Sequence, residues 1–194
     1  MKKVIFIIAL IWAYNLSAQT TAQVDITTKS GTEAEKKTMA LLQETLQTYD
    51  LGRWIFTNKV IIQENVIPHS HPVLTLSTWS RNKQEIASSF IHEQLHWYMS
   101  ANYDKTEKAM AEFRKKYKEV PFNNRAGAQD ENSTYMHLVN CYLEYRSMAL
   151  LIGEEEAKQL MWNTSHYTWV YNKVIEDREY IGKVVQDVGL DLLK

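Results

Sequence analysis

The chain has 194 residues, of which 45% are hydrophobic and 23% are charged, the composition of an ordinary globular domain that can bury a core. A formal net charge of −1 gives no electrostatic attraction to nucleic acid or to an anionic membrane, so we expect neither as a partner. The only cysteine is Cys141, which excludes an intrachain disulfide and, in an apolar helical stretch, predicts a buried thiol.

Residues 1–18 have the pattern of a secretory signal peptide. Lys2 and Lys3 precede an apolar run from Val4 to Ala13, and small residues follow this run up to Ala18. A helix that spans a bilayer needs about 20 apolar residues, so the run is too short for a membrane anchor. We therefore expect cleavage after Ala18, export to the periplasm or secretion, and no stable membrane insertion of the mature protein.

Residues 19–31 are polar and rich in threonine, without periodicity, which predicts a flexible lead-in. We expect residues 32–194 to form a single domain. Between Thr32 and Asp50, apolar residues recur at helical spacing and Gly52 follows directly, so a helix is predicted there.

The next segment predicts a small sheet. Two runs of β-branched and aromatic residues, Trp54–Thr57 and Val60–Gln63, are typical of strands. A third run, Val73–Thr78, alternates apolar and hydroxyl residues and follows Pro72, which favours an edge strand.

The remainder is predicted to be helical, which gives an α+β fold with a small sheet followed by an all-helical part. Ser133 is the expected N-cap of one of these helices, and Gly153 is expected to end it. The predicted helices cover Lys83–Ser100, Lys105–Glu119, Thr134–Ile152 and one or two further segments between residues 154 and 193, where Val170, Val174, Ile181, Val184 and Val188 are expected to face inward.

The motif His92-Glu93-Gln94-Leu95-His96 lies in the first of these helices, and its uncharged flanks predict a buried position. Residues four apart share one face of a helix, so His92 and His96 can bind one tetrahedral zinc ion. Glu93 lies about 100° around the helix from His92, where its carboxylate reaches a zinc-bound water rather than the metal. The motif therefore predicts one Zn2+ per chain and a hydrolase in which Glu93 is the general base.

A catalytic zinc needs a third protein ligand and one open position. His137 and Glu144 both lie on a polar stripe of the otherwise apolar helix Thr134–Ile152, and such a stripe should face a buried polar partner. His137 is the expected ligand and Glu144 is the alternative. Whichever of them does not bind the metal is expected to hydrogen-bond a zinc-binding histidine and fix its tautomer.

A helix, a small sheet with an edge strand, and then a helix with HExxH make the chain similar to the zincin metallopeptidases between Thr32 and Ile152. The resemblance implies that an extended peptide pairs with the edge strand, so His71, Val73 and Thr75 are candidate substrate-binding residues. For His71, an ordinary turn residue flanked by prolines is the alternative. An uncharacterised bacterial family of small exported HExxH proteins resembles the chain at His69–Thr78, Phe90–Tyr98 and Tyr135–Tyr145.

The expected function is a zinc-dependent hydrolase, a peptidase that acts on a peptide or protein substrate. One alternative is a zinc-binding module that recognises a partner without cleaving it, although such a module has no use for the general base Glu93. The other alternative is a zinc hydrolase of a non-protein amide or ester. An open groove beside Val73–Thr78 would favour peptides, and a closed pocket would favour small molecules.

Overall fold

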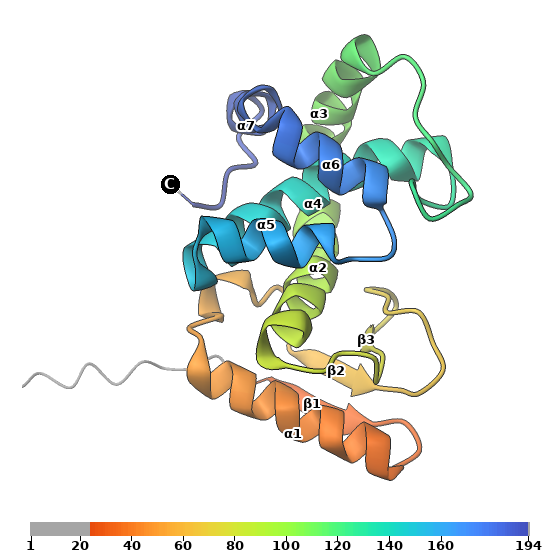
Figure 1. The fold of residues 1–194 in the computed structure, drawn as a ribbon, viewed down its shortest axis with the longest axis vertical. Helices are drawn as coiled ribbons and strands as arrows, with labels where there is room; N and C mark the ends of the chain where they lie inside the picture. The colour runs from red at the N-terminus through yellow and green to blue at the C-terminus, as the bar shows by residue number, and fades with distance from the viewer. Residues whose placement is uncertain (1–23, 194) are drawn as a thin grey trace, which may run out of the picture.

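The computed structural model describes residues 24–193, and these residues form the expected α+β fold, with seven α-helices and a three-stranded sheet (Figure 1). The predicted signal peptide, residues 1–18, lies outside the described residues. One contiguous apolar core connects the sheet with the helices. In chain order the elements are β1 (Asp25–Thr28), α1 (Glu33–Thr48), a 3₁₀ turn (Gly52–Trp54), β2 (Lys59–Ile62), β3 (Leu74–Leu76), α2 (Lys83–Ala101), α3 (Tyr103–Lys116), α4 (Glu131–Ile152), α5 (Glu154–Trp162), α6 (Thr168–Glu176) and α7 (Arg178–Asp187).

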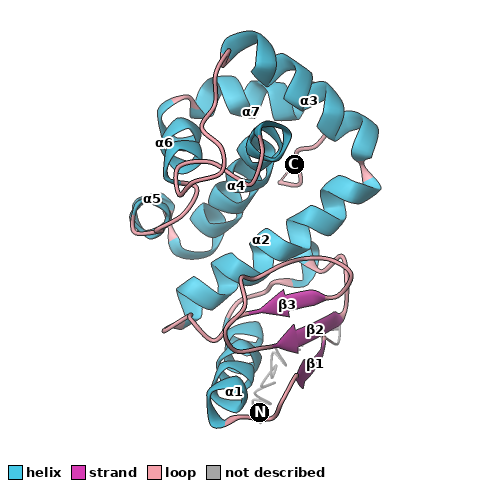
Figure 2. Ribbon diagram, turned by 90° about the vertical axis from the view of Figure 1, so that its right-hand side faces the viewer, coloured by secondary structure: helices cyan, strands magenta, loops and turns pink. Residues whose placement is uncertain are grey.

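The sheet is parallel, in the order β1-β2-β3, so β3 is at an edge of the sheet as predicted. Val60 of β2 lies opposite Ile26 on one side and Leu74 on the other. Helix α1 contacts β1 and β2, whereas α2 contacts both α1 and β3. Figure 2 shows α2 lying between the sheet with α1 on one side and helices α3 to α7 on the other, so the helix that carries the histidine motif lies at the junction of the two parts.

Of the flexible lead-in predicted over residues 19–31, the part up to residue 23 lies outside the described residues, and the prediction is wrong for Asp25–Thr28, which forms strand β1. This strand is polar, and its residues are alternately exposed and partly exposed. Its order comes from backbone pairing with β2, a partner about thirty residues further along the chain. A pattern of side chains does not reveal such a pairing.

The predicted strand Trp54–Thr57 is also wrong. Residues Gly52–Trp54 form a 3₁₀ turn, and the backbone that follows is bound by a side chain instead of a neighbouring strand. The amide oxygen of Gln94 accepts the N–H groups of Phe56 and Thr57 at 2.8 and 2.9 Å, and its amide nitrogen donates to the carbonyl of Thr57 at 2.8 Å. Gln94 therefore satisfies the backbone groups that a sheet partner would otherwise satisfy.

Helix α4 lies at the centre of the helical part and contacts α2, α3, α5, α6 and α7 (Figure 1). Its N-cap is Asp130 rather than the predicted Ser133, because the Asp130 carboxylate accepts the N–H of Ser133 at 2.7 Å. Gly153 ends the helix as predicted, with a φ of 95° that favours glycine.

Three helices follow α4, where one or two were predicted. The chain turns at residues 163–167 and again at Asp177, and neither turn contains the glycine or proline that usually marks a break. Among residues 24–193, no helix combines the length and the apolarity that crossing a membrane requires. Of the residues expected to face inward, Val188 is only partly buried, whereas the others are buried: Val170, Val174, Ile181 and Val184.

Candidate metal centre

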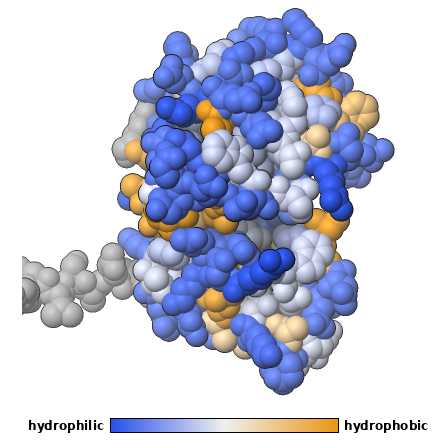
Figure 3. All heavy atoms as spheres, viewed as in Figure 1, coloured by the Kyte–Doolittle hydropathy of each residue, from blue (hydrophilic) through white to orange (hydrophobic). Residues whose placement is uncertain are grey.

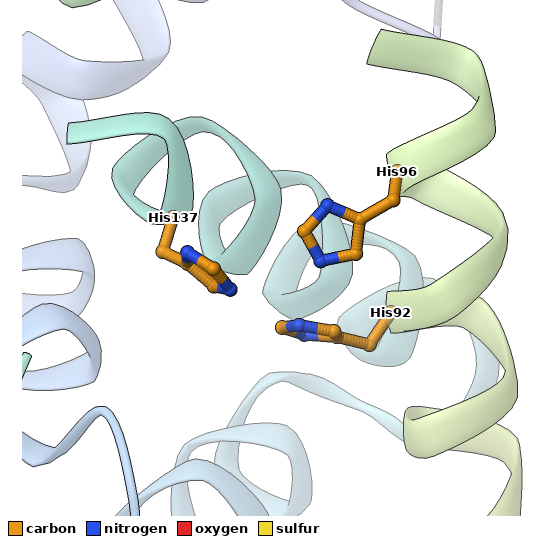
Figure 4. A group of neighbouring side chains, drawn as sticks. All are labelled: His92, His96 and His137. Carbon is orange, nitrogen blue, oxygen red and sulfur yellow. The ribbon is translucent and has the colours of Figure 1, made fainter. Parts of the chain in front are cut away.

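Two histidines lie one turn apart on α2. His92 and His96 project from the same face of the helix, with ring centroids 5.1 Å apart (Figure 4). The helix begins well before the motif because the Asn82 side chain caps it by accepting the N–H of Glu85. Phe90 and Ile91 before the motif and Met99 after it are buried in the core, which fixes the orientation of this face of α2.

His137 of α4 completes the group. Its ring centroid lies 5.5 Å from that of His92 and 5.2 Å from that of His96, and ligand nitrogens of the three rings lie within 4.8 Å of one another. When three imidazoles bind one tetrahedral zinc ion, each with a Zn–N distance of about 2.0–2.1 Å, their ring centroids lie about 5.2 Å apart. The observed spacings of 5.1, 5.5 and 5.2 Å match this value, so the three rings fit one ion.

Hydrogen bonds set the tautomers of two of these rings. Nδ1 of His92 lies 2.8 Å from a carboxylate oxygen of Glu144, and Nδ1 of His137 lies 2.6 Å from the carbonyl oxygen of Ser133. A carbonyl and a carboxylate both accept hydrogen bonds, so Nδ1 carries a proton in both rings. In both histidines, Nε2 is thereby left as the nitrogen that can bind a metal ion.

Glu144 lies behind His92 and not among the three rings. It is 2% exposed, and the hydroxyls of Ser88 and Tyr171 donate to its carboxylate at 2.5 and 2.8 Å. With the Nδ1–H of His92, three donors satisfy this buried carboxylate. Glu144, His92 and Cys141 form a second buried group with ligand atoms within 4.8 Å of one another. Of the two predicted third ligands, the structure thus brings His137 to His96 and places Glu144 on the other nitrogen of His92.

The electrostatic surroundings keep two of the three imidazoles neutral. Burial and the neighbouring His92 lower the pKa of His137 to about 3 and the pKa of His96 to about 2. Burial alone would lower the pKa of His92 as well, but the adjacent Glu144 carboxylate outweighs burial and holds that pKa well above its ordinary value. A metal ion that binds at Nε2 of His92 therefore takes the place of a proton.

Glu93 lies beside this group on α2 and faces a cavity. Its side chain is 6% exposed, and burial raises the pKa of its carboxyl to about 7, against the opposing influence of His92. A carboxyl group with a pKa in this range exchanges protons readily at neutral pH. The structure thus puts His92, Glu93 and His96 together as the sequence motif predicts.

The cavity has a volume of 570 Å³ and runs from the histidines along the end of α2 to α3 and the start of α4. Exposed residues such as His71, Tyr103 and Gln129 form part of its lining, so the cavity opens to solvent. Figure 3 shows the face of Figure 1 hollowed at mid-height, between the helices above and the sheet part below. An open cavity of this kind can admit part of an extended polymer such as a peptide.

Of the predicted substrate-binding residues, only His71 lines this cavity, where its ring stacks on Trp97 at a centroid distance of 4.2 Å. Val73 and Thr75 do not line the cavity, and the predicted pairing of a substrate with the backbone of Thr75 is wrong. Thr75 is 3% exposed, and its backbone N–H and carbonyl pair with His69 at 2.8 and 3.0 Å. The chain itself therefore covers the outer edge of β3, because the segment before this strand folds back against it.

Two tyrosines of the C-terminal part were not predicted to belong to the site. Tyr167 lines the cavity and stacks on His137 with ring centroids 4.3 Å apart and an interplanar angle of 28°. Tyr171 does not line the cavity, and its hydroxyl donates a hydrogen bond to the Glu144 carboxylate. Tyr167 precedes α6 in a segment without periodicity, so the sequence gives no signal for it. Its neighbour His166 is exposed.

Comparison with protein-family models, with curated proteins and with solved structures finds no match to this chain. What the protein can do therefore has to follow from its own side chains. Among the described residues, histidine, cysteine and glutamate side chains where α2 packs on α4 form groups that can hold a metal ion.

Proposed function

We propose that the protein is a zinc-dependent hydrolase that cleaves peptide bonds, with His92, His96 and His137 as zinc ligands. The observation that carries the proposal is the nearly equal spacing of the three rings, at 5.1, 5.5 and 5.2 Å, which matches one tetrahedral ion. Three neutral nitrogen ligands with an adjacent cavity leave a fourth position for water or substrate, the arrangement of a catalytic rather than a structural zinc.

A zinc ion held by His92, His96 and His137 would supply a Lewis acid that polarises a carbonyl group and lowers the pKa of water. Glu93 accepts the proton of the attacking water at its carboxylate and returns it to the leaving amine. Glu144 holds the His92 ring in place through Nδ1, and Tyr171 and Ser88 hold Glu144 in turn. His71, on the rim of the cavity, contacts the substrate.

The cavity favours a peptide over a small amide or ester, because it opens along exposed residues instead of enclosing its contents. The zincin resemblance supports the same choice, since α2 with its HExxH lies against a small sheet. The outermost backbone beside the site is the segment at His69, which runs antiparallel to β3. An extended substrate would lie along this segment and not along β3 itself.

Metal analysis tests the ligand set. We expect one zinc ion per purified chain, and loss of most of this zinc when His92, His96 or His137 is replaced by alanine. His166→Ala is the matched control, because this histidine is exposed and lies outside the cluster. Zinc retained at the wild-type level by His137→Ala would refute the assignment.

Hydrolysis tests the proposed chemistry. We expect Glu93→Gln to keep its zinc and to cleave unfolded casein at least about a hundredfold more slowly than the wild type, because it cannot accept a proton. If Glu93→Gln is as active as the wild type, Glu93 is not the general base.

A further inference from the structure

Acidic side chains line the cavity beside the histidines. Three acidic residues line it: Glu93, Glu107 and Asp130. No lysine or arginine is found among the described residues of the lining. A free C-terminal carboxylate of a peptide would thus find no lysine or arginine to bind. The lining disfavours anionic groups and leaves room for a cation.

The distance from the histidines to one of these carboxylates can be estimated along α4. Asp130 is the N-cap of this helix, seven residues before His137, which corresponds to about 10 Å along the helix axis. An extended peptide advances about 3.4 Å per residue. In a peptide whose cleaved bond lies at the three histidines, a side chain about three residues from that bond therefore reaches the region of Asp130.

Glu107 of α3 reaches the same cavity. It is partly buried, and it has no hydrogen bond or ion pair with any described residue. On the outer face of the same helix, Glu112 is paired with Lys115 at 2.5 Å. Lys105, also on α3, donates to the carbonyl of Gly189 and does not line the cavity. Glu107 is thus a partly desolvated carboxylate without a partner, which favours a cation beside it.

Glu93 provides a second, independent indication of a ligand. It is 6% exposed, faces the cavity and has no hydrogen-bond partner among the described residues. A buried polar group without a protein partner is normally satisfied by water or by a ligand. A ligand in the cavity can therefore reach the unpaired carboxylate of Glu93.

We propose that this cavity selects a cationic nitrogen of the peptide, a Lys or Arg side chain or a free N-terminal amine, and that Glu107 and Asp130 hold this nitrogen about three residues from the bond at the histidines. The inference rests on the proposed peptidase function for its substrate, but its test does not require turnover. A zinc ion would lie at the histidines, about 10 Å along α4 from Asp130, so the cation binds away from the metal.

Binding to the zinc-loaded Glu93→Gln protein tests the inference. The probes are pools of short peptides with blocked ends that are identical except for Lys, Gln or Glu at one position, and a Gln pool with a free N-terminus. Fluorescence anisotropy should show roughly tenfold tighter binding of the Lys pool than of the Glu pool. The two Gln pools separate the sources, because only the free-amine pool gains affinity if the N-terminus is the bound cation.

Variants of the same protein localise the effect. Glu107→Lys should abolish or reverse the preference for the Lys pool, and Asp130→Asn, which keeps the helix cap, should weaken it. Glu112→Lys is the matched control, since it reverses a charge of α3 outside the cavity. Equal binding of the Lys and Glu pools, or a preference that survives Glu107→Lys, would overturn the inference.

The outcomes for this inference and for the proposed function can be told apart. If the wild type cleaves peptides while the pools bind equally, charge selection is wrong and the peptidase function stands. If the Lys pool is preferred while the wild type cleaves no peptide, charge selection stands and the peptidase function is wrong. A protein that neither binds the pools nor cleaves peptides refutes both.

Discussion

Tyr167 adopts an unfavourable backbone conformation next to the candidate metal centre. Its φ of 56° and ψ of 29° lie in the left-handed region, which costs a residue with a side chain about 1–2 kcal/mol. The backbone after it is tied down, because the N–H groups of Thr168 and Trp169 donate to the carbonyls of Arg125 and Ala126 at 3.2 and 3.0 Å. These bonds hold the tyrosine ring against the imidazole of His137.

We expect Tyr167→Ala to weaken zinc binding by up to about tenfold, because stacking of aromatic rings is worth roughly 0.5–1.5 kcal/mol. Tyr167→Phe keeps the ring and should bind zinc as the wild type does. Competition with a chromophoric chelator measures both affinities. Tyr103→Ala serves as the control, since this exposed tyrosine lines the same cavity from α3. Wild-type affinity in Tyr167→Ala would mean that the stack does not position His137.

At the scale of residues, the sequence predicts what helical periodicity determines. His92, Glu93 and His96 are close together in any helix, so their spacing in the sequence was sufficient to predict that they lie side by side. His137 and Glu144 share one face of another helix, and periodicity could not decide between them. The choice depends on how α4 is placed along α2, which brings His137 to His96 and Glu144 to Nδ1 of His92. Such a placement comes from packing of the whole core.

Gln94, inside the histidine motif, has a structural role in connecting elements. Its buried amide makes three hydrogen bonds to the backbone of Phe56 and Thr57, between the 3₁₀ turn and β2. We expect Gln94→Leu to lower the free energy of unfolding by about 3 kcal/mol, because buried backbone groups lose their partners. Urea unfolding of the zinc-free protein measures this. Gln43→Leu, an exposed position on α1, is the control; equal effects of the two substitutions would contradict the prediction.

Glu35 connects the first turn of α1 to the sheet. Its carboxylate accepts the backbone N–H groups of Ser30, Gly31 and Glu64 at 2.8, 2.7 and 3.3 Å. Burial by itself raises the pKa of Glu35, but these hydrogen bonds outweigh burial, and the net shift is below the ordinary value. A pKa lower in the folded than in the unfolded state makes the ionised carboxylate stabilising above the unfolded-state pKa, and this stabilisation disappears as the pH falls through the folded-state pKa.

Glu35→Gln should therefore be less stable than the wild type at pH 7, and the difference should shrink as the pH falls below about 4. Urea midpoints of the two zinc-free proteins across this pH range provide the measurement. Glu33→Gln is the control, since Glu33 is exposed and paired only with Lys36. A stability difference that stays constant with pH would show that the charge of Glu35 is not the cause.

Elements were predictable where their own residues specify them. The helices have apolar periodicity and caps, and the positions of α1, α2 and α4 follow from these features. Strand β1 and the turn at Trp54 depend on partners distant in sequence, namely β2 and Gln94. The covered edge of β3 has the same origin, because His69 returns to pair with Thr75. Pairings between distant segments leave no mark on local composition.

On the scale of the whole molecule, the candidate metal centre lies where two parts of the fold meet. Helix α2 packs against the sheet part, and α4 is the helix that the other helices of the second part contact. His92 and His96 come from the first of these helices and His137 from the second (Figure 4). An ion held by all three would connect the two parts directly, so its contribution to stability should extend over the whole described chain.

We therefore expect removal of the metal to lower the melting temperature of the entire protein in one transition. A ligand present at a hundred times its dissociation constant stabilises the folded state by about 2.7 kcal/mol. For a domain of this size that corresponds to a shift of roughly 5–10 °C. Differential scanning calorimetry before and after treatment with EDTA measures the shift, and added zinc, but not magnesium, should reverse it because imidazoles bind magnesium weakly. His137→Ala should melt at one temperature whether or not zinc is added, since α4 then has no imidazole to offer. A melting temperature that EDTA leaves unchanged in the zinc-loaded wild type would show that no metal ion connects α2 to α4.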